Sequence, residues 1–178
     1  HIFCTKDQIE SEIINFLNLL QEVYEDFGFN KPSFYLSLRP ENRTGNDEMW
    51  DYSESVMKNI LEKSGVDFSI QEGEGAFYGP KIDITVPDAL EREWQLGTVQ
   101  LDFFASDKFG LNFINKNGDK ENVVLIHRAI FGSLERFFGI LIEHFGGSFP
   151  FWLSPEQFSI IPISENQFEH CKSLEKKL

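Results

Sequence analysis

The sequence predicts an α+β domain in which an antiparallel β-sheet is flanked by helices. Alternating apolar residues indicate half-buried strands at 33–38, 81–86 and 93–103. Asn117-Gly118 is typical of a tight hairpin turn, here joining 111–114 to the strand that enters His127. The helical patterns are grouped apart from these strands, which favours α+β over the regular strand–helix alternation of α/β proteins.

The first 71 residues are predicted to form three strands and two helices. The middle strand, 33–38, is one of the alternating strands named above. His1 to Cys4 is a short strand end. Thr5 and Gln8 have the spacing of a capping box, and the apolar periodicity after them predicts a long amphipathic helix that a glycine ends. Asn46 is predicted to cap a second helix that runs to about residue 63, and a strand is predicted over 68–71.

The stretch Val123 to Gly147 is predicted to be a buried strand followed by a helix whose apolar side, from Leu134 onward, faces the core. Gly132, Arg136 and Gly139 lie at i, i+4 and i+7 and so share one stripe of that helix. An interior glycine costs about 1 kcal/mol relative to alanine. One reason to accept two is that a flat, anionic partner approaches the bare backbone beside the guanidinium. The alternative is a helix–helix contact through the glycines, with Arg136 in solvent.

Polar residues on and before the predicted strands give further candidates. Gln95 and Gln100 are five residues apart, so they share a face only if a bulge, for which Gly97 is suited, resets the register. Tyr78 and Lys81 either belong to a turn or place a hydroxyl and an ammonium over a pocket. Their loop, EGEGAFYGPK, lacks the G-K-[ST] ending of a P-loop.

Two histidines end predicted strands. His127 and His1 could together form half of a zinc site, for which zinc would want at least a third protein ligand. The alternative is that each is a hydrogen-bonded core histidine. The chain shows no nucleophile with a base and an orienting third group, so stabilisation of charge is the more natural chemistry.

Length and composition limit how many domains the chain can form and which partners it can bind. The 178 residues suffice for one domain with a piece of another. After Gly147 the composition shifts, and a strand at 157–163 followed by a helix capped at Ser164 is predicted to begin a second domain. The net charge of −13 opposes a large basic surface for nucleic acid. No apolar run approaches the roughly 20 residues of a membrane span. The chain begins without methionine, so a fragment or a processed product is expected.

Five phrases in chain order resemble the threonyl-tRNA synthetases, a family of class II aminoacyl-tRNA synthetases. They are HIFCT at 1, RPENRTGNDEMWD at 39, GEGAFYGPKIDI at 73, WQLGTVQLDF at 94 and IHRAIFGSLERF at 126. The resemblance covers essentially the whole chain. It implies an incomplete class II catalytic fold over 1–153, from the end of motif 2 through motif 3. It also implies the first strand and helix of an α/β anticodon-binding domain over 154–178.

The resemblance also implies roles for individual residues. They are Gln95, Thr98 and Arg136 for ATP, with Arg136 as the catalytic motif 3 arginine; Tyr78, Lys81 and Gln100 for threonine and the adenylate; and His1 and His127 for zinc. The zinc of this family binds the amino and hydroxyl groups of threonine, which fits the strong rejection of an isostere lacking the hydroxyl, here valine.

The implied function is activation of threonine with ATP and Mg²⁺ and its transfer to tRNA(Thr) by a cytoplasmic, homodimeric parent enzyme. Two cysteines at opposite ends of the chain agree with a reducing cytosol. Motif 1, the motif 2 arginine and the cysteine ligand of zinc are missing from the phrases, so this chain alone is expected to be inactive. The alternatives are a prolyl or seryl synthetase, or a non-catalytic relative that binds tRNA or a regulatory partner.

Overall fold

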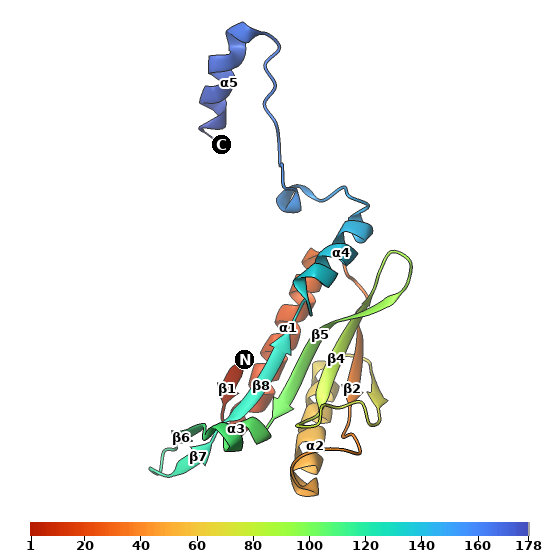
Figure 1. Cartoon of the computed structure of the whole chain (residues 1–178), viewed down its shortest axis with the longest axis vertical. Helices are drawn as coiled ribbons and strands as arrows, with labels where there is room; N and C mark the ends of the chain where they lie inside the picture. The colour runs from red at the N-terminus through yellow and green to blue at the C-terminus, as the bar shows by residue number, and fades with distance from the viewer. Residues whose placement is uncertain (178) are drawn as a thin grey trace. The chain divides into compact units, whose positions relative to one another are not determined.

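The structure is a computed structural model that describes residues 1–177 (Figure 1). Two compact units, His1–Leu141 and Ile142–Leu178, make up the chain and are taken separately below. Across the described residues, no helix combines the length and the apolarity that crossing a membrane requires.

A six-stranded sheet organises the first unit. Its strands, in order across the sheet, are β1 (Ile2–Cys4), β8 (Val124–Ala129), β5 (Glu93–Asp102), β4 (Lys81–Pro87), β2 (Ser33–Ser37) and β3 (Phe68–Gln71). Every neighbouring pair is antiparallel except β2 and β3. Helix α2 (Asp47–Ser64) connects that pair, and a parallel pair needs such a crossover. The predicted α+β class is confirmed, with one parallel pair that alternation alone does not reveal.

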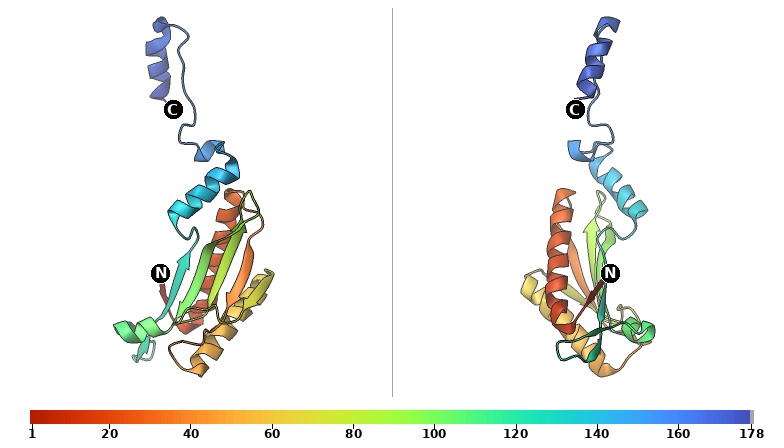
Figure 2. Two further views of the ribbon diagram at one scale, coloured as in Figure 1. Left: turned by 45° about the vertical axis from the view of Figure 1, so that its right-hand side comes forward. Right: turned by 90° about the vertical axis from the view of Figure 1, so that its left-hand side faces the viewer.

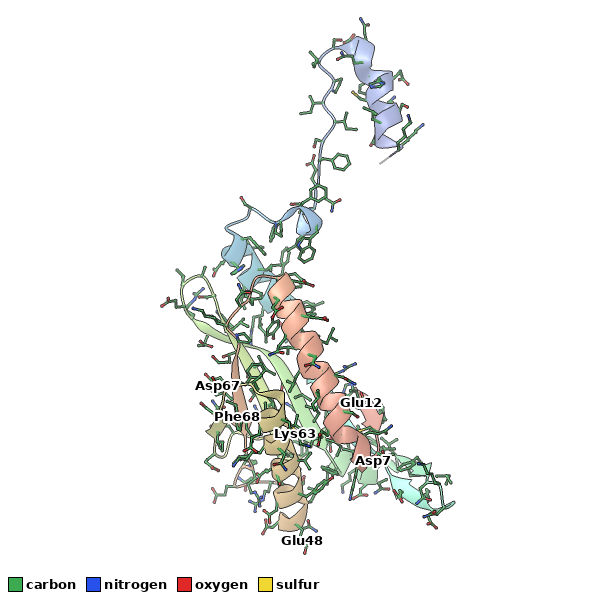
Figure 3. All side chains as sticks on the ribbon, turned by 180° about the vertical axis from the view of Figure 1, so that it is seen from behind. Asp7, Glu12, Glu48, Lys63, Asp67 and Phe68 are labelled. Carbon is green, nitrogen blue, oxygen red and sulfur yellow. The ribbon has the colours of Figure 1, made fainter. Side chains whose placement is uncertain are left out.

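Helices α1 (Ile9–Asp26) and α2 both lie on one face of the sheet, as Figure 2 shows. The short 3₁₀ helix η1 (Lys6–Gln8) precedes α1, and the predicted capping box of Thr5 and Gln8 is present. The start of α2 is capped by Asn46, whose Oδ1 accepts a hydrogen bond from the Met49 amide at 2.9 Å. The two helices are also joined by an exposed ion pair between Glu10 and Lys63; Lys63 is labelled in Figure 3, which shows this helical face.

The core of the first unit lies between these helices and the sheet. Its fully buried side chains include Ile13, Phe16, Leu20 and Tyr24 of α1, Trp50, Met57 and Ile60 of α2, and Ile82, Ile84 and Val99 of the sheet. Burial of an apolar side chain of this size stabilises the fold by about 1.5–3 kcal/mol. The packed face therefore holds the strands rigid and leaves their other face for polar groups.

Three short elements come after β5 and before β8 along the chain. The predicted Asn117-Gly118 hairpin is confirmed, but it joins β6 (Asn112–Ile114) to a short strand, β7 (Lys120–Asn122), in a separate two-stranded sheet. Helix α3 (Phe104–Phe109) was not predicted. It has six residues, too few for an apolar period to be read from the sequence.

Helix α4 (Leu134–Phe145) differs from its prediction in two ways. Gly132 lies before the helix, in a turn with φ of +64°, so it does not share a helical stripe with Arg136. The apolar side is also only partly covered, because Phe137 is buried whereas Leu134 and Phe138 are 70% and 59% exposed. Periodicity identifies an apolar side but not which of its residues find a neighbour.

The second unit contains η2 (Phe151–Leu153), η3 (Glu165–Gln167) and α5 (Phe168–Glu175). The predicted helix after Ser164 is confirmed, but the predicted strand at 157–163 is wrong. A strand needs a partner to satisfy its backbone, and within residues 1–177 this segment pairs with none. The proposed domain boundary between residues 153 and 154 stays a prediction.

Candidate functional site

The sheet face away from α1 and α2 carries a row of polar side chains on β4 and β5. A Cβ on Gly97 would lie 2.7 Å from Leu20 and 3.0 Å from the Tyr24 hydroxyl, so this side of β5 faces α1. Side chains alternate along a strand, so Thr98 and Gln100 lie on the face opposite Gly97. The residue between them, Val99, is fully buried, while Thr98 and Gln100 are only partly covered. The polar row therefore faces away from the helices.

A bulge in β5 brings Gln95 onto this polar face. Ile84 pairs with Gly97, whereas the next residue, Thr85, pairs with Gln95, so Leu96 is the extra residue. The bulge that the spacing of the two glutamines requires is thus confirmed, one position before Gly97. Without it, Gln95 would point toward the helices.

Asp83 on β4 is the centre of the row. Its carboxylate is buried and accepts hydrogen bonds from Gln95 Nε2 at 2.5 Å, Thr98 Oγ1 at 3.2 Å and Ser37 Oγ at 2.9 Å. The ammonium of Lys81 lies 2.8 Å from its Oδ2. Three strands thus place four donors around one carboxylate, which fixes the rotamers of three residues that the resemblance assigns to substrates.

Tyr78 lies over the other end of this row. Its hydroxyl donates a hydrogen bond to Gln100 Oε1, and its ring centroid is 5.6 Å from that of His127. Burial raises the pKa of the Tyr78 hydroxyl, and the charge of Asp102 raises it further, so the group stays a proton donor at neutral pH.

The loop that carries Tyr78 is held on both sides by backbone contacts. The Gly75 amide donates to the Leu38 carbonyl at 2.7 Å. Gly79 lies so close to β5 that a Cβ would be 1.7 Å from the Leu101 carbonyl oxygen. A glycine is required there, next to Tyr78, whose hydroxyl donates to Gln100.

His1 and His127 lie together, as predicted for half of a zinc site. Their ring centroids are 4.8 Å apart in an edge-to-face arrangement. His127 Nε2 lies 2.9 Å from Asp102 Oδ2, an arrangement common for metal-ligating histidines. Within residues 1–177 no group of three or more His, Cys, Asp or Glu side chains could hold a metal. The two imidazoles suit zinc as a pair and would need further ligands.

Arg136 lies at the Gln95 end of the row. Its Nη1 donates to the Gln95 carbonyl at 3.4 Å, and its Cζ is 5.8 Å from the centroid of the Trp94 ring. The side chain is exposed, and no atom lies within 4 Å of a Cβ placed on Gly139. Over the described residues, the helix–helix contact through Gly139 is therefore absent, and the backbone beside Arg136 is open.

The structure thus connects all eight predicted site residues in one path of contacts. The path runs from Arg136 through Gln95 and Thr98 to Asp83 and Lys81. It crosses to Gln100 by the pairing of β4 with β5, and continues through Tyr78 and His127 to His1. Sequence reasoning missed Asp83 and Asp102. Asp83 alternates with Lys81 on the polar side of its strand, and that position was the only available signal. Nothing local in the sequence marks Asp102.

Residues 1–145 match the protein family described as tRNA synthetase class II core domain (G, H, P, S and T). The chain belongs to this class II synthetase family. It is 51% identical over 174 residues to the threonine–tRNA ligases of Francisella tularensis subsp. tularensis and subsp. novicida. The match covers 98% of this synthetase chain but 27% of those proteins.

Two solved structures are similar to this class II synthetase chain. The RNA binding domain of threonyl-tRNA synthetase from Cryptosporidium parvum Iowa II superposes with a TM-score of 0.93 at 44% identity, covering 99% of this chain and 44% of that one. A threonyl-tRNA synthetase from Aeropyrum pernix gives a TM-score of 0.76 at 28% identity, covering 98% and 42%. The resemblance predicted from the five phrases is confirmed.

Proposed function

We propose that this class II synthetase chain forms the part of a threonine–tRNA ligase that binds ATP and threonine. One observation carries the proposal: a single path of contacts joins Arg136 to the two histidines along the open face of the sheet. ATP and threonine must lie side by side to react, and such a row provides a cation at one end and two imidazoles at the other.

Arg136 would bind the nucleotide together with Gln95 and Thr98. Its guanidinium is planar, permanently charged and exposed, so it can stack on a base and also neutralise phosphate. Open backbone at Gly139 leaves room for a flat group beside it. Mg²⁺ would accompany the phosphates, as expected of ATP-dependent activation.

Tyr78, Lys81 and Gln100 would bind threonine and the adenylate. The hydroxyl of Tyr78 holds Gln100, and Asp83 holds the Lys81 ammonium, so their polar groups are oriented before a substrate arrives. His1 and His127 would hold zinc, with further ligands from outside the described residues. Zinc bound there supplies a Lewis acid that selects an amino acid with a hydroxyl group.

The parent enzyme would transfer the activated threonine to tRNA(Thr) in the cytoplasm and act as a homodimer. The chain itself carries a net charge of −13. Most contacts to tRNA phosphates are therefore expected from other parts of the parent protein, since such contacts need cations.

Threonine-dependent exchange between ATP and pyrophosphate tests the proposal, in the full-length gene product that contains this sequence. Arg136→Ala is expected to lower kcat/KM for ATP by about 100-fold or more, the effect of removing a group that stabilises transition-state charge. Arg128→Ala is the matched control. Its Cζ lies 5.8 Å from the ring of Phe16 on α1, on the helical side of the sheet, so exchange should stay within about two-fold.

The choice of amino acid decides between the alternatives. Exchange supported by proline or serine in place of threonine would favour another class II synthetase. No exchange with any amino acid, in a folded protein that still binds tRNA, would favour a non-catalytic relative. Equal losses in the Arg136 and Arg128 variants would remove Arg136 from the nucleotide site.

A further inference from the structure

We propose that Asp102 is a positioning residue that fixes the tautomer of His127 and so directs a defined ring nitrogen toward the metal. This inference rests on the zinc part of the proposed function. Asp102 is the last residue of β5, and its side chain is only 6% exposed. Its Oδ2 lies 2.9 Å from His127 Nε2. A buried carboxylate must have partners for both of its oxygens, and His127 is the partner of one.

The second oxygen of Asp102 is held by the start of α3. Oδ1 accepts hydrogen bonds from the backbone amides of Phe104 and Ala105, each at 2.8 Å. These two bonds prevent rotation of the carboxylate away from His127. Asp102 therefore links the fold of the β5–α3 turn to the orientation of one imidazole, and a helix cap alone would not need the second oxygen to face His127.

The carboxylate decides which nitrogen of His127 carries the proton. An ionised carboxylate only accepts hydrogen bonds, so a neutral imidazole facing it must present an N–H at Nε2. Nδ1 then holds the lone pair, and it forms no hydrogen bond with any of the described residues. A metal ligand needs such a lone pair, and a carboxylate on the other nitrogen raises the basicity of the ligand.

The isosteric variant Asp102→Asn separates this role from that of a helix cap. The amide oxygen of asparagine can keep both bonds to the α3 backbone, while its NH₂ group faces Nε2. Two donors cannot share a hydrogen bond, so the proton of His127 is expected to move to Nδ1. The control is Asp107→Asn, the same change on α3, where Asp107 accepts from Asn122 and not from His127.

Long-range ¹H–¹⁵N NMR spectra of the His127 ring, recorded on the 178-residue chain at about pH 8, measure the tautomer. We expect the Nε2–H form in the unmodified chain and in Asp107→Asn, and the Nδ1–H form in Asp102→Asn. In the full-length gene product, which would supply the further ligands, addition of Zn²⁺ should perturb the His127 signals, with an affinity about 10- to 100-fold weaker in Asp102→Asn.

The outcomes distinguish the role of Asp102 in setting the tautomer from the presence of a zinc site. An Nδ1–H form in the unmodified chain would overturn the inference even if the asparagine variant failed to fold. An unchanged tautomer or unchanged Zn²⁺ affinity in a folded Asp102→Asn chain would overturn it as well. If Zn²⁺ leaves the His127 signals of the full-length gene product unaltered while the tautomer is as expected, the zinc site of the proposed function fails and Asp102 still sets the tautomer.

Discussion

Asp83 shows how a single buried carboxylate can organise a surface that sequence patterns describe only residue by residue. Alternation along 81–86 puts Asp83 on the side of the strand opposite Ile82 and Ile84, and this placement is correct. It could not predict that Lys81, Gln95 and Thr98 all turn toward it, because two of these contacts cross between strands and depend on a bulge. The residue types of the site were therefore predictable, and the group that holds them together was not.

Asp83→Asn is expected to destabilise the chain by about 3 kcal/mol, because it leaves the Lys81 ammonium beside an amide and weakens three other hydrogen bonds. Ser37→Ala is the control, since it removes one hydroxyl, which lies 2.9 Å from Asp83 Oδ2 and 3.3 Å from Gln71 Oε1, and should cost about 1 kcal/mol. Urea unfolding followed by circular dichroism measures both. Similar losses in the two variants would show that Asp83 is not the centre of the row.

At the scale of elements, local signals in the sequence were the most reliable. The capping box before α1 and the Asn46 cap of α2 involve residues three apart, so they were read directly and are present. The parallel pairing of β3 and the packing of the loop over β5 depend on residues far away in the chain. No short window contains the information that Gly79 must lie against Leu101.

Two glycines of similar appearance in the sequence should respond oppositely to alanine. Gly79→Ala places a Cβ against the Leu101 carbonyl, so we expect a loss of roughly 2–4 kcal/mol in unfolding free energy as the Tyr78 loop is displaced. Gly139→Ala lies in α4 with nothing within 4 Å of the new Cβ, so it should stabilise by up to about 1 kcal/mol. Thermal unfolding of both variants checks the pair.

Measurements of ATP binding distinguish a functional role of Gly139 from a purely structural one. If the open backbone receives a nucleotide, Gly139→Ala should weaken ATP binding despite the gain in stability. A variant that is more stable and binds ATP unchanged would show that the nucleotide does not approach this part of α4.

At the scale of the whole molecule, the two units differ in how much of their structure the sequence predicts. In the first unit, strands with an apolar period of two residues and helices with a period of three to four residues bury their apolar sides in one core. Each pattern therefore supports the other. In the second unit the apolar segment at 157–163 has no strand partner among the described residues, and Ile161 and Ile163 are 82% and 93% exposed. A pattern specifies a strand only when another strand is available to pair with it.

One cysteine lies in each unit, Cys4 in the first and Cys171 in the second. Burial raises the pKa of the Cys4 thiol to about 11, and the charges of Glu12 and Asp7, labelled in Figure 3, add to the shift. Little thiolate is then present near neutral pH, and the side chain is 5% exposed. Cys171 in α5 is only partly buried.

Alkylation by iodoacetamide at about pH 8 should therefore modify Cys171 at least about 100-fold faster than Cys4, because only about one Cys4 thiol in a thousand is ionised there and access is restricted as well. The Cys4 rate should rise about tenfold per pH unit until the pH approaches 11, since a raised pKa keeps the thiol protonated below that value. Mass spectrometry of the two peptides measures both rates, with the chain in urea as the control in which they converge. Equal rates in the native chain would mean that the N-terminal strand does not stay packed against β8, and the two histidines beside it would then not be held together.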